Sequence, residues 1–290
     1  MKCQRLLAAS TTAFGYMMVY RSIILSSHLE GENKEEEVLS SFTESDLQSW
    51  TRHKLLRPDI ALTFSPGSVK QFLSKQDILD LQRVIEEEGK HLPRVERDEF
   101  GRRLDFGGDK NRAAWKTTYL HSGHWAKDRI PHLLNHILRT AKEIDQSNKW
   151  HVMKNRSQLN FRTIEFHEYT EGGGLLNWRD KHFDDGSLIT IDIMLTDTNE
   201  FEGGALVFPS NHEATPYEPD FEQGDAVFFL SHKFHNVTPL RKGRRQVLVC
   251  EIWDGPEKSC AHRCVSREKC ANTESRYQLA SVLEEFMGLM

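Results

Sequence analysis

Cysteine is scarce in this sequence, with five residues among 290. That number is too small for a disulfide scaffold. Cys260, Cys264 and Cys270 lie close together and, with His262, offer four ligands for zinc, but the C-x-H-x-C spacing matches no common zinc motif. A disulfide in an exported protein and free thiols in a loop are the alternatives for this cluster.

Basic charge and long hydrophobic runs are also in short supply. The formal net charge is −5, and no long basic run occurs, so nucleic acid is not expected as the main partner. The uncharged run from Leu6 to Tyr20 is too short and too hydroxylated for a stable membrane span. What is present, 38% apolar residues and 10% aromatic residues, is typical of a soluble globular enzyme with one sizeable core.

The N-terminal region differs in composition from the rest of the chain. Residues 1–29 contain basic but no acidic side chains and are rich in Ser, Thr and apolar residues. This pattern resembles an organellar transit peptide, a weak signal peptide or a signal anchor. We therefore expect mitochondrial or endoplasmic-reticulum targeting, with the cytoplasm as the alternative. Residues 30–46 are acidic and polar, which predicts a linker.

Three segments have apolar residues at helical spacing: 74–88, 128–145 and 273–287. The first begins with a capping box at Ser74 and Asp77 and ends at Gly89. The second has Pro131 in its first turn. The Gly-rich and charged segment 97–111 between them predicts a long loop.

Short β-type runs begin at Leu159 and continue almost to the C-terminal region. They cover residues 159–169, 188–195, 205–208, 226–230 and 246–253. Gly, Pro, Asn and Asp separate them, and the gaps are too short for βαβ crossovers. Helices followed by many short strands predict a mainly β fold with supporting α-helices, a β-sandwich or jelly roll.

We accordingly divide the chain into three parts. Residues 1–49 form the targeting-like segment and linker, residues 50–258 the folded domain with a β core over 157–254, and residues 259–290 a Cys-containing loop with a C-terminal helix.

His182 and Asp184 form the one His-x-Asp pair in the chain. In an extended segment their side chains point to the same side and can reach one metal ion. His232 and His235 both follow a predicted strand and compete for the role of third ligand, because residues three apart on a strand face opposite ways. Two imidazoles and one carboxylate form the facial triad that leaves open positions on iron(II). A closed zinc site would need a fourth ligand.

Arg245 lies in an otherwise apolar strand and shares its parity with Val247 and Val249. A buried lone charge is costly, so an inward-facing Arg245 needs an anionic partner, which a dicarboxylate would supply. The alternative is a solvated basic turn that Arg245 shares with Arg244.

The segment from Tyr169 to Trp253 resembles the catalytic core of the 2-oxoglutarate/iron(II) dioxygenases, particularly their prolyl 4-hydroxylase-like branch. Five motifs carry the resemblance in order: His182–Asp184, Phe201–Leu206, Gly224–Phe228, His235–Pro239 and Gly243–Arg245. The specificity lies in the order and spacing, since each motif alone would be weak.

The resemblance implies a double-stranded β-helix core of the jelly-roll or cupin-like kind. It implies iron(II) held by His182, Asp184 and His235, with 2-oxoglutarate bound by Arg245 and Tyr169. The implied reaction couples oxidative decarboxylation of 2-oxoglutarate to hydroxylation of a protein side chain or a small molecule, with oxygen consumed and ascorbate as an optional reductant. Asp184 favours hydroxylation or demethylation over halogenation, since related halogenases lack this carboxylate.

Two further residues are candidate substrate contacts. Arg162 shares its strand with Glu165 and His167. The competing interpretation of all three is a solvated face or a cross-strand ion pair. Trp253 either lines the pocket or packs in the core. For the chain as a whole, the alternative to an enzyme is an inactive jelly-roll module that binds or senses a ligand.

Overall fold

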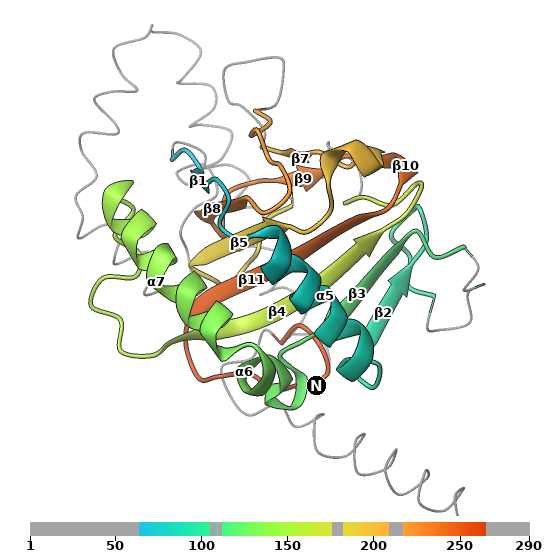
Figure 1. The fold of residues 1–290 in the computed structure, drawn as a ribbon. Helices are drawn as coiled ribbons and strands as arrows, with labels where there is room; N and C mark the ends of the chain where they lie inside the picture. Colours follow the sequence, from blue (N-terminus) through green and yellow to red (C-terminus); the bar gives the residue numbers. More distant parts are fainter. Residues whose placement is uncertain (1–63, 105–108, 110–111, 176–181, 209–216, 265–290) are drawn as a thin grey trace, which may run out of the picture. The chain divides into compact units, whose positions relative to one another are not determined.

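The computed structural model describes residues 64–104, 109, 112–175, 182–208 and 217–264 (Figure 1). The predicted targeting segment, acidic linker and C-terminal helix lie outside these residues. No helix in the described part of the chain is long and apolar enough to cross a membrane.

Strands predominate in the described residues. The α-helices are α5 (Lys75–Glu88), α6 (Trp125–Arg129) and α7 (Pro131–Ser147), with short 3-10 turns at Ser122–His124 and Thr198–Glu200. The strands are β1 (Gly67–Val69), β2 (Arg94–Arg97), β3 (Trp115–Tyr119), β4 (Leu159–Tyr169), β5 (Ile189–Met194), β6 (Phe201–Gly203), β7 (Leu206–Val207), β8 (Ala226–Leu230), β9 (Asn236–Val237), β10 (Leu240–Gly243) and β11 (Arg245–Asp254).

Seven of these strands form one antiparallel sheet, in the order β1-β8-β5-β11-β4-β3-β2. Two small antiparallel pairs, β6 with β10 and β7 with β9, lie apart from it. Mainly antiparallel strands with helices against the large sheet confirm the predicted jelly-roll class. The five predicted β runs all contain strands, and β4 and β8 have the predicted bounds.

Helices α5 and α7 lie in front of the large sheet in Figure 1. The predicted capping box of α5 is present, because the Ser74 side chain accepts from the backbone N–H of Asp77 and Asp77 accepts from the backbone N–H of Ser74. The buried stripe of α5 is Ile78, Leu81 and Ile85. This stripe is the apolar face that the sequence predicted.

The second predicted helix, 128–145, is divided in the structure, which corrects that prediction. Ile130 has φ −128° and ψ 41°, so α6 ends at Arg129 and α7 begins at Pro131. The proline ring disfavours helical geometry in the residue before it, while its own fixed φ suits the first helical position. The apolar periodicity continues across the break and therefore did not reveal it.

Three strands of the large sheet were missed from the sequence. They are β1, β2 and β3, which precede the region where β-type runs were recognised. Residues 94–97 and 115–119 are rich in charged and hydroxylated side chains, so they lack the apolar alternation of a half-buried strand. Backbone pairing determines their structure instead, because β3 pairs with β4 and β2 pairs with β3.

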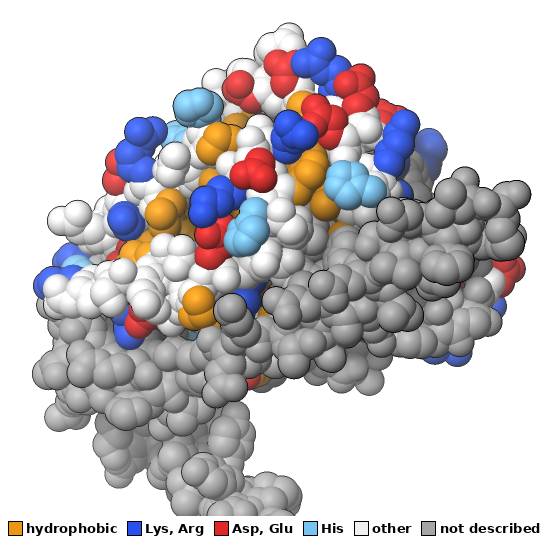
Figure 2. Space-filling model, turned by 90° about the horizontal axis from the view of Figure 1, so that it is seen from below, with side chains coloured by type: hydrophobic (Ala, Val, Ile, Leu, Met, Phe, Trp, Pro, Cys, Tyr) orange, Lys and Arg blue, Asp and Glu red, His pale blue; other side chains and the backbone are white. Residues whose placement is uncertain are grey.

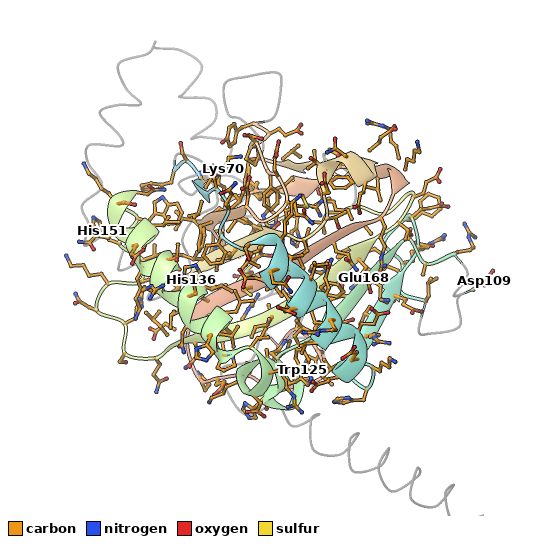
Figure 3. The ribbon with its side chains drawn as sticks, viewed as in Figure 1. Lys70, Asp109, Trp125, His136, His151 and Glu168 are labelled. Atoms are coloured by element: carbon orange, nitrogen blue, oxygen red, sulfur yellow. The ribbon has the colours of Figure 1, made fainter. Side chains whose placement is uncertain are left out.

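The face of the sheet toward the helices is mostly apolar. Ile189, Ile191 and Ile193 of β5 are all 0% exposed. Phe72 connects this face to α7, since its ring packs edge-on against Phe228 of β8 and stacks on His136 at 4.3 Å between centroids (Figure 3). We call this side of the sheet the helix-covered face.

The opposite side of the sheet, which we call the inner face, contributes to a core with the small strand pairs. Its buried members are Met194, Leu206, Phe208, Phe221, Val227, Phe229, Val237 and Val247. This cluster packs the inner face of β5, β8 and β11 against β7 and β9, while polar residues of β4, β5 and β11 occupy the rest of the inner face. On the surface seen in Figure 2, acidic, basic and apolar side chains are interspersed among the described residues.

Candidate functional site

The three predicted iron ligands lie together in the structure. His182 and His235 are partners in an isolated antiparallel bridge, in which the His235 N–H donates to the His182 carbonyl at 3.0 Å. Asp184 follows two residues later, and its N–H donates to the carbonyl of Ser231 at the end of β8 at 2.7 Å. Two neighbouring chain segments thus present all three side chains to one point.

The ligand atoms of His182, Asp184 and His235 all lie within 4.8 Å of one another. His182 Nε2 is 3.2 Å from Asp184 Oδ1, and His235 Nε2 is 3.7 Å from Asp184 Oδ2. Asp184 and His235 are buried, whereas the His182 side chain is 35% exposed. Two imidazoles and one carboxylate at this spacing fit a facial triad that is open on its exposed side.

The Asp184 carboxylate is oriented by a second layer of hydroxyl groups. Thr190 Oγ1 donates to Asp184 Oδ2 at 2.7 Å, and Thr190 and Ser231 hydroxyls are 2.9 Å apart. Burial by itself would raise the pKa of Asp184, but the charge of Arg263 and that of His235 hold it well below its usual value. The carboxylate is therefore anionic over the physiological pH range, which is the form that can bind a metal ion.

His235 is held in the tautomer that a metal ligand requires. Its Nδ1 lies 3.0 Å from the carbonyl oxygen of Lys233, so Nδ1 carries the proton and donates, and Nε2 presents its lone pair toward Asp184. Burial lowers the pKa of His235 to about 4, although Asp184 opposes the shift. A neutral imidazole is the form that binds a metal ion.

His232, the competing candidate, takes no part in this cluster. Its ring stacks on Phe183 at 5.6 Å between centroids. The structure thus separates the two histidines as expected for residues three apart, and brings His235 to the His-x-Asp pair.

Arg245 is buried in the inner face, with 1% of its surface exposed. Its Nε and Nη2 atoms have no hydrogen-bond partner in the structure. Its guanidinium carbon lies 5.5 Å from the ring centroid of Tyr169, the residue directly opposite on β4. Arg244 points the other way, is 60% exposed and pairs with Glu168 on the helix-covered face (Figure 3). The solvated-turn interpretation therefore applies to Arg244 and is wrong for Arg245.

Gly204 of the predicted Phe201–Leu206 turn makes room for Arg245. A Cβ at Gly204 would lie 2.9 Å from Arg245 Cδ and 2.9 Å from Leu240 Cδ1, and its φ of +65° is one that side chains rarely adopt. This close approach explains why the turn needs glycine at this position.

Asp192 of β5 adds a carboxylate to the inner face. It is 6% exposed, and burial raises its pKa to about 7, an effect that Arg245 opposes and Asp184 reinforces. Asp192 thus interacts electrostatically with both Arg245 and Asp184. The buried arginine and the triad therefore share the same buried region beside the inner face.

A chain of charges continues from Asp184 to Glu251 and Arg162. Arg263 Nη2 lies 2.5 Å from Asp184 Oδ1 and 2.5 Å from Glu251 Oε1. Arg162 in turn donates to Glu251 Oε2, with Nη2 at 2.5 Å, and to the carbonyl of Asp185. Two arginines and two carboxylates thus neutralise one another, which a buried network requires.

The two predicted substrate contacts lie in the interior. Arg162 is 1% exposed, and its guanidinium is occupied by Glu251 and the Asp185 carbonyl. Trp253 is 2% exposed and donates from Nε1 to the Pro256 carbonyl at 3.1 Å. These contacts orient Arg162 toward the charge network and Trp253 toward the turn after β11. Their contact with substrate stays a prediction.

Glu165 and His167 form an ion pair on the inner face, with 3.1 Å between Glu165 Oε2 and His167 Nε2. Both are buried, so the solvated-face interpretation of this strand is wrong. Because Glu165 and His167 belong to the same strand, the predicted cross-strand ion pair is instead that of Arg162 with Glu251 of β11, and that pair is confirmed. Burial would raise the pKa of Glu165, but the hydrogen bond and charge of His167 lower it to about 2. Trp115 Nε1 and Thr117 Oγ1 complete the polar contacts of His167 Nδ1, at 2.9 and 3.0 Å.

Several residues of this site were missed from the sequence. Thr190 and Asp192 were detectable in principle, because they are polar and two apart in an otherwise apolar strand, and so share a face. Glu251 has the same kind of signal in β11. Arg263 has none, because it reaches Asp184 from 79 residues away in the chain.

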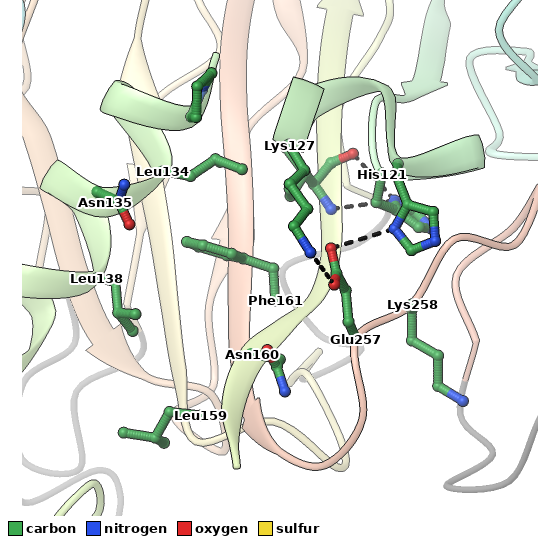
Figure 4. Close-up of a pocket in the computed structure, with 13 residues that line it drawn as sticks. His121, Lys127, Leu134, Asn135, Leu138, Leu159, Asn160, Phe161, Glu257 and Lys258 are labelled. Atoms are coloured by element: carbon green, nitrogen blue, oxygen red, sulfur yellow. Dashed lines mark hydrogen bonds and ion pairs between the residues drawn. The ribbon is translucent and has the colours of Figure 1, made fainter. Parts of the chain in front are cut away.

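A cavity of about 270 Å³ lies elsewhere, between the helices and the start of β4 (Figure 4). Its lining includes Leu134, Phe161 and Lys127, and Lys127 pairs with Glu257 at 2.7 Å. No triad residue lines it, so the cavity is separate from the candidate metal site.

Comparisons with known proteins address the same segment. Residues 164–253 match the family model described as the 2OG-Fe(II) oxygenase superfamily. No curated protein matches the chain significantly. This range contains the triad, Tyr169, Asp192 and Arg245.

Solved structures with similar folds include three prolyl hydroxylases. The viral collagen prolyl hydroxylase of Paramecium Bursaria Chlorella virus-1 has 16% identity and a TM-score of 0.42, covering 64% of this chain and 94% of its own. A Pseudomonas putida prolyl-4-hydroxylase has 14% identity and a TM-score of 0.45, covering 67% and 95%. The Trichoplax adhaerens prolyl hydroxylase has 16% identity and a TM-score of 0.45, covering 74% and 94%. No inference about substrate follows from these distant likenesses.

The family model and the site geometry agree on the same residues. The match spans β4 to β11, the strands that carry the inner face, and it includes both the triad and the buried arginine. The resemblance recognised in the sequence is therefore confirmed at the level of the superfamily: residues 164–253 of this chain match the model of the 2OG-Fe(II) oxygenase superfamily.

Proposed function

We propose that this protein is an iron(II)- and 2-oxoglutarate-dependent dioxygenase that hydroxylates a protein side chain or a small molecule. The observation that carries the proposal is Arg245, a fully buried guanidinium with two unpartnered nitrogens on the inner face that also bears the triad. Leaving such donors unpaired costs about 1–3 kcal/mol each. A dicarboxylate cosubstrate provides the missing acceptors.

The residues fit the groups that this function needs. His182, Asp184 and His235 would hold iron(II), and Arg245 would hold the distal carboxylate of 2-oxoglutarate, with Tyr169 beside it. When bound, iron supplies the oxidation: 2-oxoglutarate, oxygen and substrate C–H become succinate, carbon dioxide and substrate C–OH.

The protein's own contribution is positioning and charge. Thr190 and the Lys233 carbonyl orient two of the ligands, and the exposed side of the triad at His182 leaves an approach for substrate. The network of Arg263, Glu251 and Arg162 compensates the charge of Asp184. The prolyl 4-hydroxylase-like branch, the use of ascorbate and the choice of peptide or small molecule are parts of this proposal for experiment to decide.

Succinate formation by the purified full chain with iron(II), 2-oxoglutarate and oxygen tests the proposal. We expect slow turnover without substrate, stimulated by ascorbate and absent in the His182→Ala variant. If the protein binds iron stoichiometrically but forms no succinate, with or without a panel of candidate peptides and small molecules, the enzyme proposal is overturned. The protein would then be a binding or sensing module.

A further inference from the structure

A second cluster of metal-type side chains lies in the segment after β11. The ligand atoms of Cys260, His262 and Cys264 are all within 4.8 Å of one another. Both cysteines are 2% exposed. None of the three belongs to the facial triad, and the superfamily match ends before them, at residue 253.

The backbone that carries these ligands is fastened to the domain independently of any metal. Ser122 Oγ donates to the Cys260 carbonyl at 3.0 Å, and the Gly123 N–H donates to the Ser259 carbonyl at 2.9 Å. His121 Nε2 lies 3.2 Å from the His262 carbonyl oxygen. A short polar segment held at three points along its backbone presents the ligands in a prepared arrangement.

We propose that Cys260, His262 and Cys264 form a binding site for a second metal ion, with zinc as the best fit. Two thiolates and one imidazole are soft to borderline donors, which select zinc over magnesium or calcium. Tetrahedral zinc with bonds of about 2.0–2.3 Å places its ligand atoms roughly 3.4–3.8 Å apart. Because the ligand atoms of the cluster all lie within 4.8 Å of one another, no pair is more than about 1.4 Å wider than that geometry.

The position of this cluster connects it to the iron site. Arg263 lies between His262 and Cys264 in the chain, and its guanidinium reaches Asp184 Oδ1 and Glu251 Oε1. A metal ion that holds the flanking residues therefore fixes the backbone from which Arg263 extends. This coupling rests on the proposed function, whereas the metal site itself does not.

Metal analysis of the purified full chain separates the two sites. We expect the wild-type protein to retain about one equivalent of zinc besides the metal in the triad. The Cys260→Ser/Cys264→Ser double variant should lose this zinc and keep iron(II) binding, and Asp184→Ala should do the reverse. Cys250→Ala removes a buried cysteine of β11 outside the cluster and is the matched control. It should retain both metals.

Cobalt(II) substitution of the wild-type protein avoids the risk that a variant fails to fold. Thiolate coordination should give an intense sulfur-to-cobalt charge-transfer band that persists in Asp184→Ala. The absence of this band, or a Cys260–Cys264 disulfide found by mass spectrometry after non-reducing digestion, would overturn the site. Cobalt d–d bands that appear without the charge-transfer band and are lost in Asp184→Ala would assign the cobalt to the triad alone and also overturn it. Failure of succinate formation leaves this result unaffected, so the two proposals fail separately.

Discussion

The two faces of the large sheet use the same strands for different purposes. On the helix-covered face β5 presents three isoleucines, all 0% exposed and packed under α5 and α7. On the inner face the same strand presents Thr190 and Asp192, which interact with a metal ligand and a buried arginine. The helix-covered face thus stabilises the fold through apolar burial. The inner face instead carries buried polar groups, which interact with the triad residue Asp184 or with Arg245.

The largest expected effect on the inner face comes from Asp184→Ala. Loss of the carboxylate removes one of three ligands and leaves Arg263 without its Asp184 partner. Iron(II) binding and succinate formation should both fall to background. The neighbouring Asp185→Ala removes an exposed carboxylate and is the control. If Asp184→Ala keeps iron-dependent turnover, the ligand assignment is wrong.

The next effect concerns the pair Arg245 and Arg244, which lie on opposite faces. Truncating one partner of a buried charge pair costs about 2–5 kcal/mol, so Arg245→Met should raise the KM for 2-oxoglutarate by at least about 30-fold. Arg244→Met should change it less than about twofold, because Arg244 is 60% exposed and pairs with Glu168 on the opposite face from Arg245. Steady-state kinetics at varied 2-oxoglutarate would measure both, and equal effects would show that the faces are not separated as described.

Thr190→Val keeps the shape of an inner-face residue and removes the hydroxyl that donates to Asp184. Second-layer changes of this kind typically cost about 10–100-fold in metal affinity. We expect a loss of about tenfold in iron(II) affinity, measured by anaerobic titration, with the fold intact by circular dichroism. Unchanged affinity would mean that Thr190 is a structural residue only.

Ile191→Ala tests the adjacent residue on the helix-covered face. Truncation of a fully buried isoleucine costs about 2–5 kcal/mol of unfolding free energy. The denaturation midpoint should fall by a corresponding amount, while the KM for 2-oxoglutarate stays within about twofold of the wild-type value. A changed KM with unchanged stability would reverse the roles of the two faces.

The last effect is a pH dependence from Asp192. Burial raises its pKa from 3.8 to about 7, so between these values the folded protein holds a proton that the unfolded chain has released. Stability from this group therefore falls as pH rises across that window. Asp192→Asn should remove this slope, so its stability relative to wild type should increase from about pH 5 to about pH 8. Chemical denaturation of metal-free protein measures the difference, and a constant difference would contradict the assignment.

Local sequence signals predicted much of this structure because they act over a few residues. The capping box at Ser74, the β run 159–169 and the His-x-Asp pair each depend on neighbours in the chain. The break at Ile130 also has a local cause, the following proline, which the apolar periodicity concealed.

Features made by distant contacts were harder to predict. The polar strand β3 is a strand because β4 pairs with it, and β2 is a strand because β3 pairs with it. Arg263 meets Asp184 only through the fold. The choices of His235 over His232 and of Arg245 over Arg244 rested on a family resemblance in the sequence. The structure supplies the physical reason, which is the face on which each side chain lies.

The proposed function depends above all on Arg245 and the triad acting on one cosubstrate. Anaerobic titration of the iron(II)-loaded protein with 2-oxoglutarate tests it most directly, because chelation of iron(II) by the keto-acid produces a visible charge-transfer band. We predict a saturable band in the wild-type protein, no band in Asp184→Ala, and a midpoint raised by at least about 30-fold in Arg245→Met. A wild-type protein that binds iron stoichiometrically and gives no band, or a midpoint unaffected by Arg245→Met, would contradict the claim.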